Sequence, residues 1–477
     1  MAQIKNESIT PRDVDFAKWY TEICRKAELM DYTSMKGFII YRPYGFAIWE
    51  NIKKYLDEKF KETGHENVYL PMVIKESLFN KEKEHVEGFA PETLIVTIGG
   101  KDKLDDPLIV RPTSEVLFCE HYAKIINSYR DLPKLYNQWC SVVRYEKTTR
   151  PFLRGSEFLW QEGHTMHRTK EEAKEEAIKM LNIYDKLGKD VLAIPFIKGQ
   201  KTEKEKFAGA LETYTIEALM HDGQSLQAGT THFFGDSFAR AFDISFLDKD
   251  GVRKHPHQSS WGVSTRLIGA IIMVHGDDNG LVLPPPVAPI QVVVVPIRAD
   301  IDENVRATSE AIFENLKSKG LRVKLDDDTS RSPGWKFAEY EMKGVPIRLE
   351  IGPRDLKENK LLMATRYNDE KKFISLDDID NIPSILDDIT KKMYEKAKKF
   401  LDEHIHSAKT LEQFEEMIKN GGYVAIPYCG DEACEKKMKE LYQVTARAIP
   451  FDQKDEEGIC PICGKKTHRI VYYARAY

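Results

Sequence analysis

Charged residues interrupt apolar sequence in the stretch RPFLRGSEFLWQEGH (residues 150–164) and in two shorter segments before it, RPTSE (111–115) and VVRYE (142–146). Together the three segments hold four arginines and four glutamates, several of them beside Val, Phe, Leu or Trp. Burying such charges is costly unless they meet partners or charged ligands. Arginine binds phosphate and carboxylate groups, whereas glutamate binds ammonium and amine groups. A site that needs both suggests a zwitterionic amino acid held beside a nucleotide.

Two strands are predicted around the loop at 147–156: WCSVVRYE before it and EFLWQEGHTMH after it. Successive side chains of a strand alternate between its faces, so Arg144 and Glu146 are expected on one face of the first strand. The second strand carries its own in-phase set: Phe158, Trp160, Glu162 and His164. An isolated Arg-x-Glu is usually a surface pair. Two such strands side by side would instead present arginine, glutamate and aromatic groups to one concave surface.

The rest of the first 285 residues mixes helices with strands that are mostly not in βαβ alternation. This pattern favours an α+β domain built on a largely antiparallel sheet. Amphipathic patterns and a threonine cap predict three helices: 15–30, 44–61 and 169–190. VYLPMVI from Val68 reads as a strand, and residues 94–100 and 107–112 read as a hairpin around the polar turn KDKLDD.

Three consecutive prolines in LVLPPPVAP (281–289) indicate a linker, because proline continues neither a helix nor a central strand. We place domain 1 at residues 1–285 and the linker at 286–290. The pattern then becomes βαβαβ, which predicts a small α/β domain with a mainly parallel sheet at 291–395. A long charged helical stretch, from Ser384 to about Asn420, leads into a small C-terminal α/β module at 396–477.

The composition is that of a soluble globular protein, with 42% apolar and 31% charged residues. No apolar run approaches the roughly 20 residues of a membrane span, and the N-terminus has no hydrophobic signal region. We therefore expect a cytoplasmic protein that makes no membrane contact. The net charge of −5 does not by itself indicate a nucleic-acid binder, so any RNA contact would need local basic patches.

Four of the seven cysteines form two pairs, CGDEAC and CPIC, flanked by turn residues. The spacing, C-x4-C followed by C-x2-C, predicts a tetrahedral four-thiolate site for structural Zn2+. The predicted ligands are Cys429, Cys434, Cys460 and Cys463. The alternative is four unlinked thiols, and His468 is a weaker ligand candidate. The remaining Cys24, Cys119 and Cys140 lie in apolar patterns and are expected to pack in the core.

The segments RPTSE, RYE, FLWQEGHT and GVSTRLIGAIIMVHGDDNGLVLPP resemble the sequence motifs of the prolyl-tRNA synthetases, a family of class II aminoacyl-tRNA synthetases. Residues 68–77 are similar to the first motif of that class, with Pro71 at the dimer-forming strand. Residues 139–164 are similar to its second motif and residues 262–286 to its third. The resemblance covers nearly the whole chain. It implies a homodimer with an α+β catalytic domain on an antiparallel sheet, an α/β anticodon-binding domain and a small zinc-containing α/β module.

The resemblance also implies the reaction. Proline and ATP give prolyl-adenylate and pyrophosphate, and the prolyl group then passes to the 3′ end of tRNA(Pro). The first step is an in-line displacement that needs positioning and charge neutralisation, with Mg2+ expected on the ATP phosphates. Arg144 and Arg266 are the catalytic residues that it implies. Arg266 would open an apolar helix, where the helix dipole favours an anion rather than a cation, so a bound phosphate would resolve that conflict.

Roles in substrate binding follow by position in the motifs. Glu146 should face the adenine amino group between Phe158 and Arg266, and Arg154 should bind the terminal phosphates. The implied ATP-binding set is Arg144, Glu146, Arg154, Phe158, Gln227, Thr230 and Arg266. The implied proline-binding set is Thr113, Glu115, Arg144, Trp160, Glu162, Phe207 and His232, with His164 behind it. On residue type alone His232 is more often a satisfied core histidine.

In the α/β domain the resemblance implies anticodon contacts in and around GVPIRLEIGPRD (344–355). The implied set is Lys336, Glu341, Arg348, Arg354 and Asp355. By themselves these residues would be solvated charges on a helix and at strand ends. The arginines could read guanine edges of unpaired bases.

Two departures from bacterial-type relatives concern selectivity and the end of the chain. A large editing insertion does not fit between Phe158 and Gly262, so the chain resembles the archaeal or eukaryotic-cytoplasmic type. Selectivity by cavity size alone is limited to roughly 10 to 200-fold per methylene, so alanine and cysteine could compete with proline. The chain ends in ARAY, and the resemblance implies that the terminal carboxylate of Tyr477 approaches the active site rather than fraying.

Two other functions stay open at this point. A threonyl-type synthetase shares the anticodon domain, but its pocket commonly recruits zinc within the catalytic domain. A non-catalytic RNA-binding paralogue would keep the fold and lose the phosphate-binding arginines, whereas Arg144, Arg154 and Arg266 are all in place.

Overall fold

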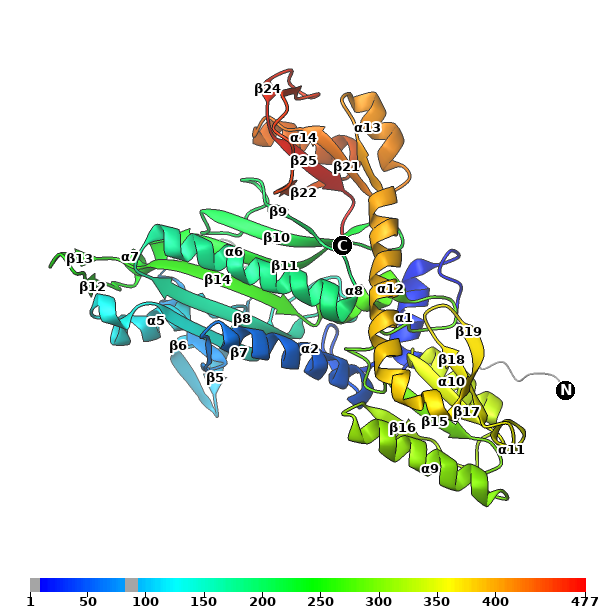
Figure 1. Ribbon diagram of the computed structural model, residues 1–477. Helices are drawn as coiled ribbons and strands as arrows, with labels where there is room; N and C mark the ends of the chain where they lie inside the picture. Colours follow the sequence, from blue (N-terminus) through cyan, green and yellow to red (C-terminus); the bar gives the residue numbers. More distant parts are fainter. Residues whose placement is uncertain (1–8, 82–92) are drawn as a thin grey trace.

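The computed structural model describes residues 9–81 and 93–477, and its centre is one sheet of eleven strands (Figure 1). The order is β20 (Ile405–Ser407), β21 (Tyr423–Pro427), β25 (Ile470–Ala474), β22 (Thr445–Pro450), β9 (Ile197–Gln200), β10 (Glu212–Leu219), β11 (Ser225–Gly235), β14 (His257–Ser264), β8 (Glu157–His167), β7 (Lys134–Val143) and β3 (Glu66–Asn67). The outermost pairings, β3 with β7 and β20 with β21, are parallel. The eight between them are antiparallel. The predicted antiparallel sheet is therefore confirmed in its centre, while the whole sheet is mixed.

Helices cover both faces of this sheet. Four share one apolar core with it: α1 (Phe16–Lys26), α2 (Pro43–Glu62), α6 (Lys170–Leu187) and α8 (Arg266–His275). The three predicted helices among them are confirmed, and α6 begins at the predicted cap, where Thr169 Oγ1 accepts the Glu172 N–H at 3.2 Å. The other face carries α5 (Glu115–Ile125) and α7 (Ser237–Ala241) with a second core around Phe118 and Phe238.

The strand predicted from Val68 is much shorter than expected, because only β4 (Val73–Lys75) belongs to a strand there. Pro71 has no N–H to donate. The carbonyl oxygens before β4 are taken by buried Arg111, whose Nη1 donates to Leu70 O at 2.7 Å and Pro71 O at 3.3 Å. Arg111 also donates from Nε to Ser141 O at 3.0 Å, so it braces this segment against β7.

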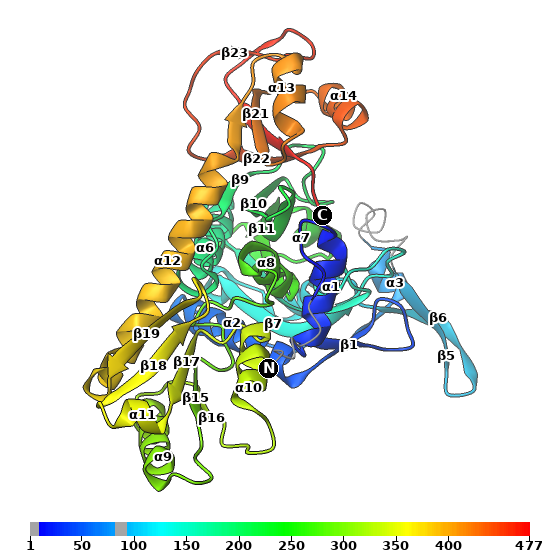
Figure 2. The same ribbon diagram turned by 90° about the vertical axis from the view of Figure 1, so that its right-hand side faces the viewer.

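The predicted hairpin exists, but its turn was placed too late in the chain. β5 (Leu94–Gly99) pairs with β6 (Asp102–Val110), and Gly100 turns with φ of +65°, which favours glycine. Most of KDKLDD therefore lies within β6. Figure 2 shows this hairpin projecting from the body of the molecule.

The α/β domain has a five-stranded sheet that is only partly parallel. Its order is β16 (Val323–Leu325), β15 (Val292–Pro296), β17 (Ile347–Ile351), β18 (Lys360–Thr365) and β19 (Glu370–Ser375), with helices α9 (Glu303–Ser318) and α10 (Pro333–Met342). The βαβαβ strands pair in parallel, as predicted, whereas β18 and β19 add antiparallel pairings. The prediction of a mainly parallel sheet thus holds only for the first three strands.

The helical stretch predicted from Ser384 to about Asn420 is broken. It consists of α12 (Ile382–Glu403), β20 and α13 (Leu411–Ile418). Figure 1 shows α12 running from the α/β domain to the C-terminal module, and the boundary predicted at 395/396 falls inside it. Within the described part of the chain, no helix is both long and apolar enough to cross a membrane.

The proline-rich stretch at 281–289, which contains most of the linker predicted at 286–290, is packed rather than free. Leu281 N donates to Met342 O at 3.0 Å and Leu283 N to Gly344 O at 3.3 Å, and both leucine side chains are buried. A Cβ on Gly344 would lie 2.6 Å from Leu281 Cβ, so a glycine is required for this close approach. The linker therefore fixes the α/β domain against the first domain.

The C-terminal module extends the central sheet instead of forming a separate one. β22 pairs with β9 through Ile449–Gln200 and Pro450–Gly199. A Cβ on Gly199 would lie 2.4 Å from Ile449 O, so this pairing depends on the absence of a side chain there.

A buried charge network locks the same junction. Glu217 of β10 accepts from Lys201 Nζ at 2.7 Å and from Arg447 Nη2 of β22 at 2.8 Å. Ser225 Oγ also donates to Glu217, at 2.9 Å. Burial raises the pKa of the Glu217 carboxyl, but Arg447 and Lys201 outweigh it and lower that pKa to about 2. The two cations thus keep the Glu217 carboxylate ionised inside the protein.

We predict that Arg447→Met lowers the free energy of unfolding by about 3–5 kcal/mol, because Glu217 would stay buried with one of its two cations removed. Denaturant unfolding of the full chain measures this. Arg469→Met is the matched control, since Arg469 is an exposed arginine of the same module. Equal stability of the two variants would contradict the assignment.

Candidate active site

A cavity of about 200 Å³ opens on the α5 side of the central sheet, over β8, β11 and β14. Of the residues predicted to bind ATP or proline, all but Glu146 and Arg154 line it. These lining residues are Thr113, Glu115, Arg144, Phe158, Trp160, Glu162, Phe207, Gln227, Thr230, His232 and Arg266. Residues from both halves of the first domain thus meet at one place.

Arg144 and Glu146 were predicted on the first strand, but they lie beyond its end. β7 ends at Val143, and the Arg144 N–H donates to Ser156 O at 2.7 Å in the loop before β8. The Glu146 carboxylate accepts from Arg154 Nε at 2.9 Å, and the Arg154 side chain is 57% exposed. The chain therefore leaves the ladder before these residues, and the two outlying members of the ATP set contact each other at the rim.

Arg144 is held against the aromatic residues of β8. Its Nε donates to Pro112 O at 3.0 Å, and its guanidinium lies 5.5 Å from the Phe158 ring and 5.3 Å from the Trp160 ring. Cation–π contact of this kind stabilises an arginine that is partly removed from water. Trp160 Nε1 is buried and has no hydrogen-bond partner among the described residues. The two aromatic rings therefore fix Arg144 beside the Trp160 Nε1–H group, which could donate a hydrogen bond to a ligand.

Arg266 is the first residue of α8, as predicted. Its Nε donates to Leu153 O and its Nη1 to Gln227 O, both at 3.2 Å. Burial, followed by the charge of Arg144, lowers the pKa of Arg266 to about 10, so the guanidinium is still charged at neutral pH. Arg266 at the N-terminus of α8 and Arg144 beyond the end of β7 together form a site that favours an anion.

Glu162 is fully engaged by protein groups. It accepts from Ser114 Oγ at 2.5 Å, from Ser114 N at 3.1 Å and from Gln138 Nε2 at 2.8 Å, and His164 Nε2 lies 2.9 Å away. Burial raises its pKa, but the His164 interaction and these hydrogen bonds lower it to about 2. Glu162 is thus an ionised carboxylate whose hydrogen bonds order the pocket wall. His164, which was expected behind the proline-binding set, is itself a lining residue of the cavity.

The other side of the cavity contains His232 between two threonines. His232 Nδ1 lies 3.0 Å from Thr213 Oγ1 and Nε2 lies 3.1 Å from Thr230 Oγ1. Its ring packs on Phe207 at a centroid distance of 4.5 Å. Burial, then the charges of His164 and Arg144, lower the pKa of His232 to about 3. His232 is therefore a neutral imidazole in the cavity wall.

Thr113 and Glu115 form the remaining acidic part of the cavity. Thr113 Oγ1 donates to Glu115 Oε2 at 2.5 Å, and both side chains are buried. Glu115 begins α5, where the helix dipole stabilises a carboxylate.

Sequence reasoning missed the residues that support the site. Ser114 and Gln138 hold Glu162, and nothing in their local pattern signals it, since both are ordinary polar residues in predicted strands or loops. Arg111 was part of the charged set from which a site was inferred, but it binds backbone carbonyls instead of lining the cavity. Arg111 follows the apolar strand β6, and only the fold shows that it braces the backbone instead of binding a ligand.

The four paired cysteines converge, and all their sulfur atoms lie within 4.8 Å of one another. Cys429 Sγ is 3.7 Å from Cys434 Sγ and 3.6 Å from Cys463 Sγ. A tetrahedron with metal–sulfur bonds of about 2.3 Å has sulfur atoms about 3.8 Å apart, whereas a disulfide is far shorter. The donor set therefore fits a metal ion. His468 lies apart from it, with Nδ1 2.8 Å from Asp455 Oδ1.

In the α/β domain, two of the five residues predicted to meet an anticodon are buried in ion pairs. Lys336 Nζ lies 3.0 Å from Asp326 Oδ1, and Arg348 Nη2 lies 2.9 Å from Glu350 Oε1. Arg348 and Glu341 both line a cavity of about 320 Å³ in this domain. The other two predicted residues, Arg354 and Asp355, belong to the short helix α11 (Pro353–Leu356). The expectation of solvated charges is thus wrong for Lys336 and Arg348.

The last residue, Tyr477, is anchored rather than frayed. Its N–H donates to Ser225 O at 3.1 Å and its hydroxyl donates to Asp222. The Arg150 guanidinium lies 5.4 Å from its ring. Arg150 opens the turn that carries Leu153, whose carbonyl holds Arg266, so the end of the chain lies close to the cavity wall.

The depressed pKa of His232 predicts a pH dependence of stability. Between about pH 3 and pH 6.5 the unfolded histidine is protonated and the folded one is neutral, so folding releases a proton. This contribution makes the free energy of unfolding fall by about 1.4 kcal/mol per pH unit as the pH drops through that window. His232→Gln should remove this part of the slope, as measured by denaturant unfolding at several pH values. An unchanged slope would show that His232 does not titrate in this way.

Comparisons with known proteins agree with this arrangement. Three family models match successive parts of the chain: the tRNA synthetase class II core domain (G, H, P, S and T) at residues 96–275, the anticodon binding domain at 291–382 and the C-terminal domain of prolyl-tRNA synthetase at 411–477.

Relatives that match over nearly the whole chain are named proline--tRNA ligase. The proline--tRNA ligase of Clostridium novyi (strain NT) is 59% identical over 473 residues, which cover 99% of this chain and 98% of the relative. The proline--tRNA ligase of Clostridium botulinum (strain Loch Maree / Type A3) is 57% identical with the same coverage. Proline--tRNA ligase 2 of Bacillus cereus is 56% identical over 479 residues and the full length of both chains. The class II resemblance drawn from the motifs is confirmed, and the chain belongs to the prolyl-tRNA synthetase family.

Proposed function

We propose that the cavity over β8, β11 and β14 is where this ATP-dependent proline–tRNA ligase forms prolyl-adenylate and transfers the prolyl group to tRNA(Pro). The observation that carries the proposal is the convergence of two arginines, Arg144 and Arg266, on a cavity that also holds the acidic pair Thr113 and Glu115. One end is thus suited to phosphate and carboxylate, and the other to a secondary ammonium.

At the nucleotide end, Arg266 and Phe158 sandwich the adenine and Glu146 accepts a hydrogen bond from its amino group. Gln227 and Thr230 reach the nucleotide and its ribose. The Arg154–Glu146 contact of 2.9 Å supports a rearrangement on binding. ATP would draw the exposed Arg154 to its terminal phosphates and release Glu146 for the base.

At the proline end, Glu115 and Thr113 accept the two ammonium hydrogens while Trp160 and Phe207 enclose the ring. His232, neutral and fixed by two threonines, is a side wall that favours an apolar ring. Glu162 contributes through position, because its oxygen atoms already accept hydrogen bonds from Ser114 and Gln138. It holds the start of α5, and hence Glu115, in place.

Catalysis then rests on orientation and on neutralising charge in the displacement at the α-phosphorus. Arg144 holds the substrate carboxylate against the α-phosphate, and Arg266 stabilises the charge that develops there. Bound Mg2+ would supply further neutralisation on the ATP phosphates. No side chain needs to act as nucleophile, because the proline carboxylate attacks.

Zn2+ is the metal that we assign to Cys429, Cys434, Cys460 and Cys463. Four thiolates leave no open coordination position, so the ion is structural. It ties the 429–434 turn to the 460–463 turn in the module whose strand β22 extends the central sheet.

A homodimer accounts for the exposed apolar surface near the first motif. Tyr69 is 71% exposed and Met72 54%, and Ile98 on the projecting β5–β6 hairpin is 59% exposed (Figure 2). Large exposed apolar side chains are typical of an interface. Pro71 lies between two of them.

tRNA(Pro) would use the α/β domain for its anticodon. Arg348 and Glu341 face the cavity of that domain and Arg354 and Asp355 lie on α11, whereas Lys336 orders Asp326 behind them. Unpaired bases suit such a pocket, because their edges are free to bond.

Between β8 and β14, residues 168–256 form α6, the strands β9 to β13 and α7, all of them described. Of these elements, β9, β10 and β11 belong to the central sheet, α6 and α7 pack on it, and β12 and β13 form a small hairpin. We therefore assign the chain to the archaeal or eukaryotic-like type without an editing insertion. As a separate proposal, the protein acts in the cytoplasm. We also assign the Tyr477 carboxylate to the active-site edge, supported by its anchoring at Ser225.

ATP–pyrophosphate exchange with the purified full-length chain tests the function directly. Proline, threonine, alanine and cysteine are compared at matched concentrations, and the strongest exchange is expected with proline. Stronger exchange with threonine would move the chain to the threonyl type. An absence of exchange with every amino acid, with and without tRNA, would favour the RNA-binding paralogue.

Arg144→Lys should lower proline-dependent exchange by about 10²–10³-fold, because a lysine cannot bind carboxylate and phosphate with a planar fork. Arg240→Lys is the matched control, since Arg240 forms a surface pair with Asp236 and does not line the cavity. Exchange within a few-fold of the unchanged protein in both variants would contradict the role of Arg144.

Metal analysis should find about one Zn2+ per chain, and Cys463→Ser should lose it together with thermal stability. Cys119→Ala controls for the loss of a cysteine elsewhere in the core and should retain the metal. Metal-free protein, or full metal content in Cys463→Ser, would show that the four thiols are not a zinc site.

A further inference from the structure

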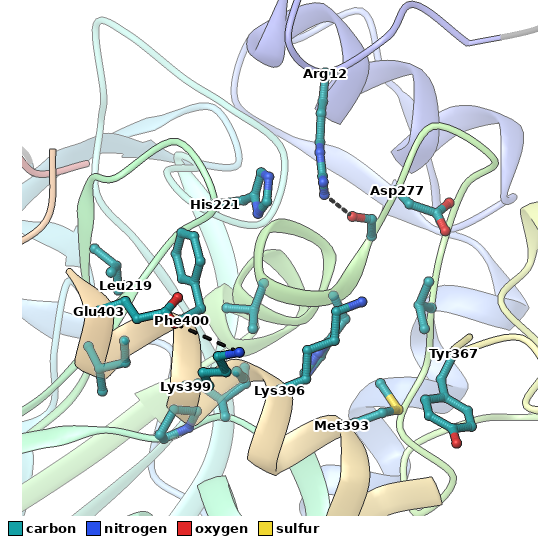
Figure 3. Close-up of a pocket in the computed structure, with 18 residues that line it drawn as sticks. Arg12, Leu219, His221, Asp277, Tyr367, Met393, Lys396, Lys399, Phe400 and Glu403 are labelled. Atoms are coloured by element: carbon teal, nitrogen blue, oxygen red, sulfur yellow. Dashed lines mark hydrogen bonds and ion pairs between the residues drawn. The ribbon is translucent and has the colours of Figure 1, made fainter. Parts of the chain in front are cut away.

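A second cavity, of about 320 Å³, lies where α8 ends and α12 passes beside the α/β domain (Figure 3). Its walls include Arg12 near the N-terminus, residues 274–277 at the end of α8, Leu219 with His221, and one side of α12 from Met393 to Glu403. Arg266 begins α8 in the proposed active site, and this cavity lies at the other end of that helix. No role assigned above uses it.

One wall of this junction cavity is a stack of aromatic rings. The His221 and Phe400 rings stack with centroids 5.4 Å apart and planes at 15° (Figure 3). Leu219 and Met393 add apolar surface. Burial, then the charge of Arg12, lower the pKa of His221, so its ring is neutral at pH 7. Such a wall suits a planar apolar group.

The acidic groups of the lining are already paired. Asp277 Oδ2 accepts from Arg366 Nη1 at 2.7 Å, and Glu403 lies 3.9 Å from Lys399 Nζ. Two cationic side chains have no carboxylate partner within the described residues, namely Lys396 and Arg12. Arg12 Nη1 donates only to Gly276 O, at 2.8 Å. The cavity therefore combines an apolar wall with unneutralised positive charge.

We propose that the junction cavity binds a small aromatic monoanion, that is, a planar ring carrying one carboxylate. The ring would lie against His221 and Phe400, and the carboxylate would meet Lys396 and Arg12. A polyphosphate does not fit, because two cations cannot neutralise it and much of the lining is apolar. The volume is near the lower limit of ligand pockets, about 300 Å³, which suits a one- or two-ring compound. The proposal is independent of the proposed function.

The test measures binding of 2-naphthoate and of uncharged 2-naphthamide to the full-length chain by isothermal titration calorimetry. Saturating proline, ATP and Mg2+ keep the active site occupied. We expect one naphthoate per chain, bound with a sub-millimolar Kd and at least about tenfold tighter than the amide. Equal binding of the two probes, no binding of naphthoate, or its loss on adding proline and ATP would overturn the proposal.

Variants place the probe in the cavity. Lys396→Met should weaken naphthoate binding by about tenfold, equivalent to one charge-assisted contact. Lys398→Met is the matched control on the same helix, because Lys398 pairs with Asp402 and does not line the cavity. Ala397→Trp fills the cavity and should abolish binding. Unchanged binding in Lys396→Met would overturn the assignment by itself, and proline-dependent exchange in that variant shows that it is folded.

Discussion

Two carboxylates buried in one sheet constrain most of this structure. Glu162 in β8 and Glu217 in β10 each have a pKa held near 2, so both are ionised inside the protein. A buried charge is tolerated only where partners replace its lost hydration. Around Glu162 the partners are serine, glutamine and histidine, and they build a pocket wall. Around Glu217 they are Lys201 and Arg447, and they join two domains.

The two networks belong to the same sheet, so the cavity and the domain junction are connected through neighbouring strands. Glu217 pairs across the ladder with Gln227, whose carbonyl oxygen accepts a hydrogen bond from Arg266. Arg447 of the C-terminal module is thus connected to Arg266 of the cavity through Glu217 and Gln227. The last residue of the chain adds a second tie at Ser225, on the same strand as Gln227. The C-terminal module therefore supports the part of the cavity wall formed by Gln227 and Arg266, while its four-cysteine cluster lies elsewhere.

The sequence predicted the members of the cavity better than it predicted their backbone. Arg144 and Glu146 were expected on a strand because apolar residues precede them, yet the chain leaves the ladder at Val143. Alternation cannot reveal where a strand stops pairing, since that depends on its partner. Similarly, Arg111 and Lys336 carry the charge of ligand-binding residues but serve the backbone or an internal carboxylate. The type of a residue indicates which chemistry its side chain can perform. Whether the side chain binds a ligand or supports the fold depends on its burial and its partners, which are set by the tertiary structure.

The four cysteines are the opposite case, since short spacing and turn residues were sufficient to predict that they converge. The shared sheet could not be predicted in this way, because β9 and β22 are about 250 residues apart in the chain and each is short. The local sequence of neither strand indicates that the other is its pairing partner.

Gly199 has one further consequence. Because it lets β22 lie against β9, the backbone N–H and C=O groups along that side of β9 are covered by this chain's own C-terminal module. A strand edge left open in a sheet this long is a template for pairing with another molecule. The module thus moves the open edge of the sheet from β9 to β20, a strand of three residues that offers little backbone for pairing. A nascent chain that has finished its first domain but not its last 70 or so residues would carry that open edge until β22 is made.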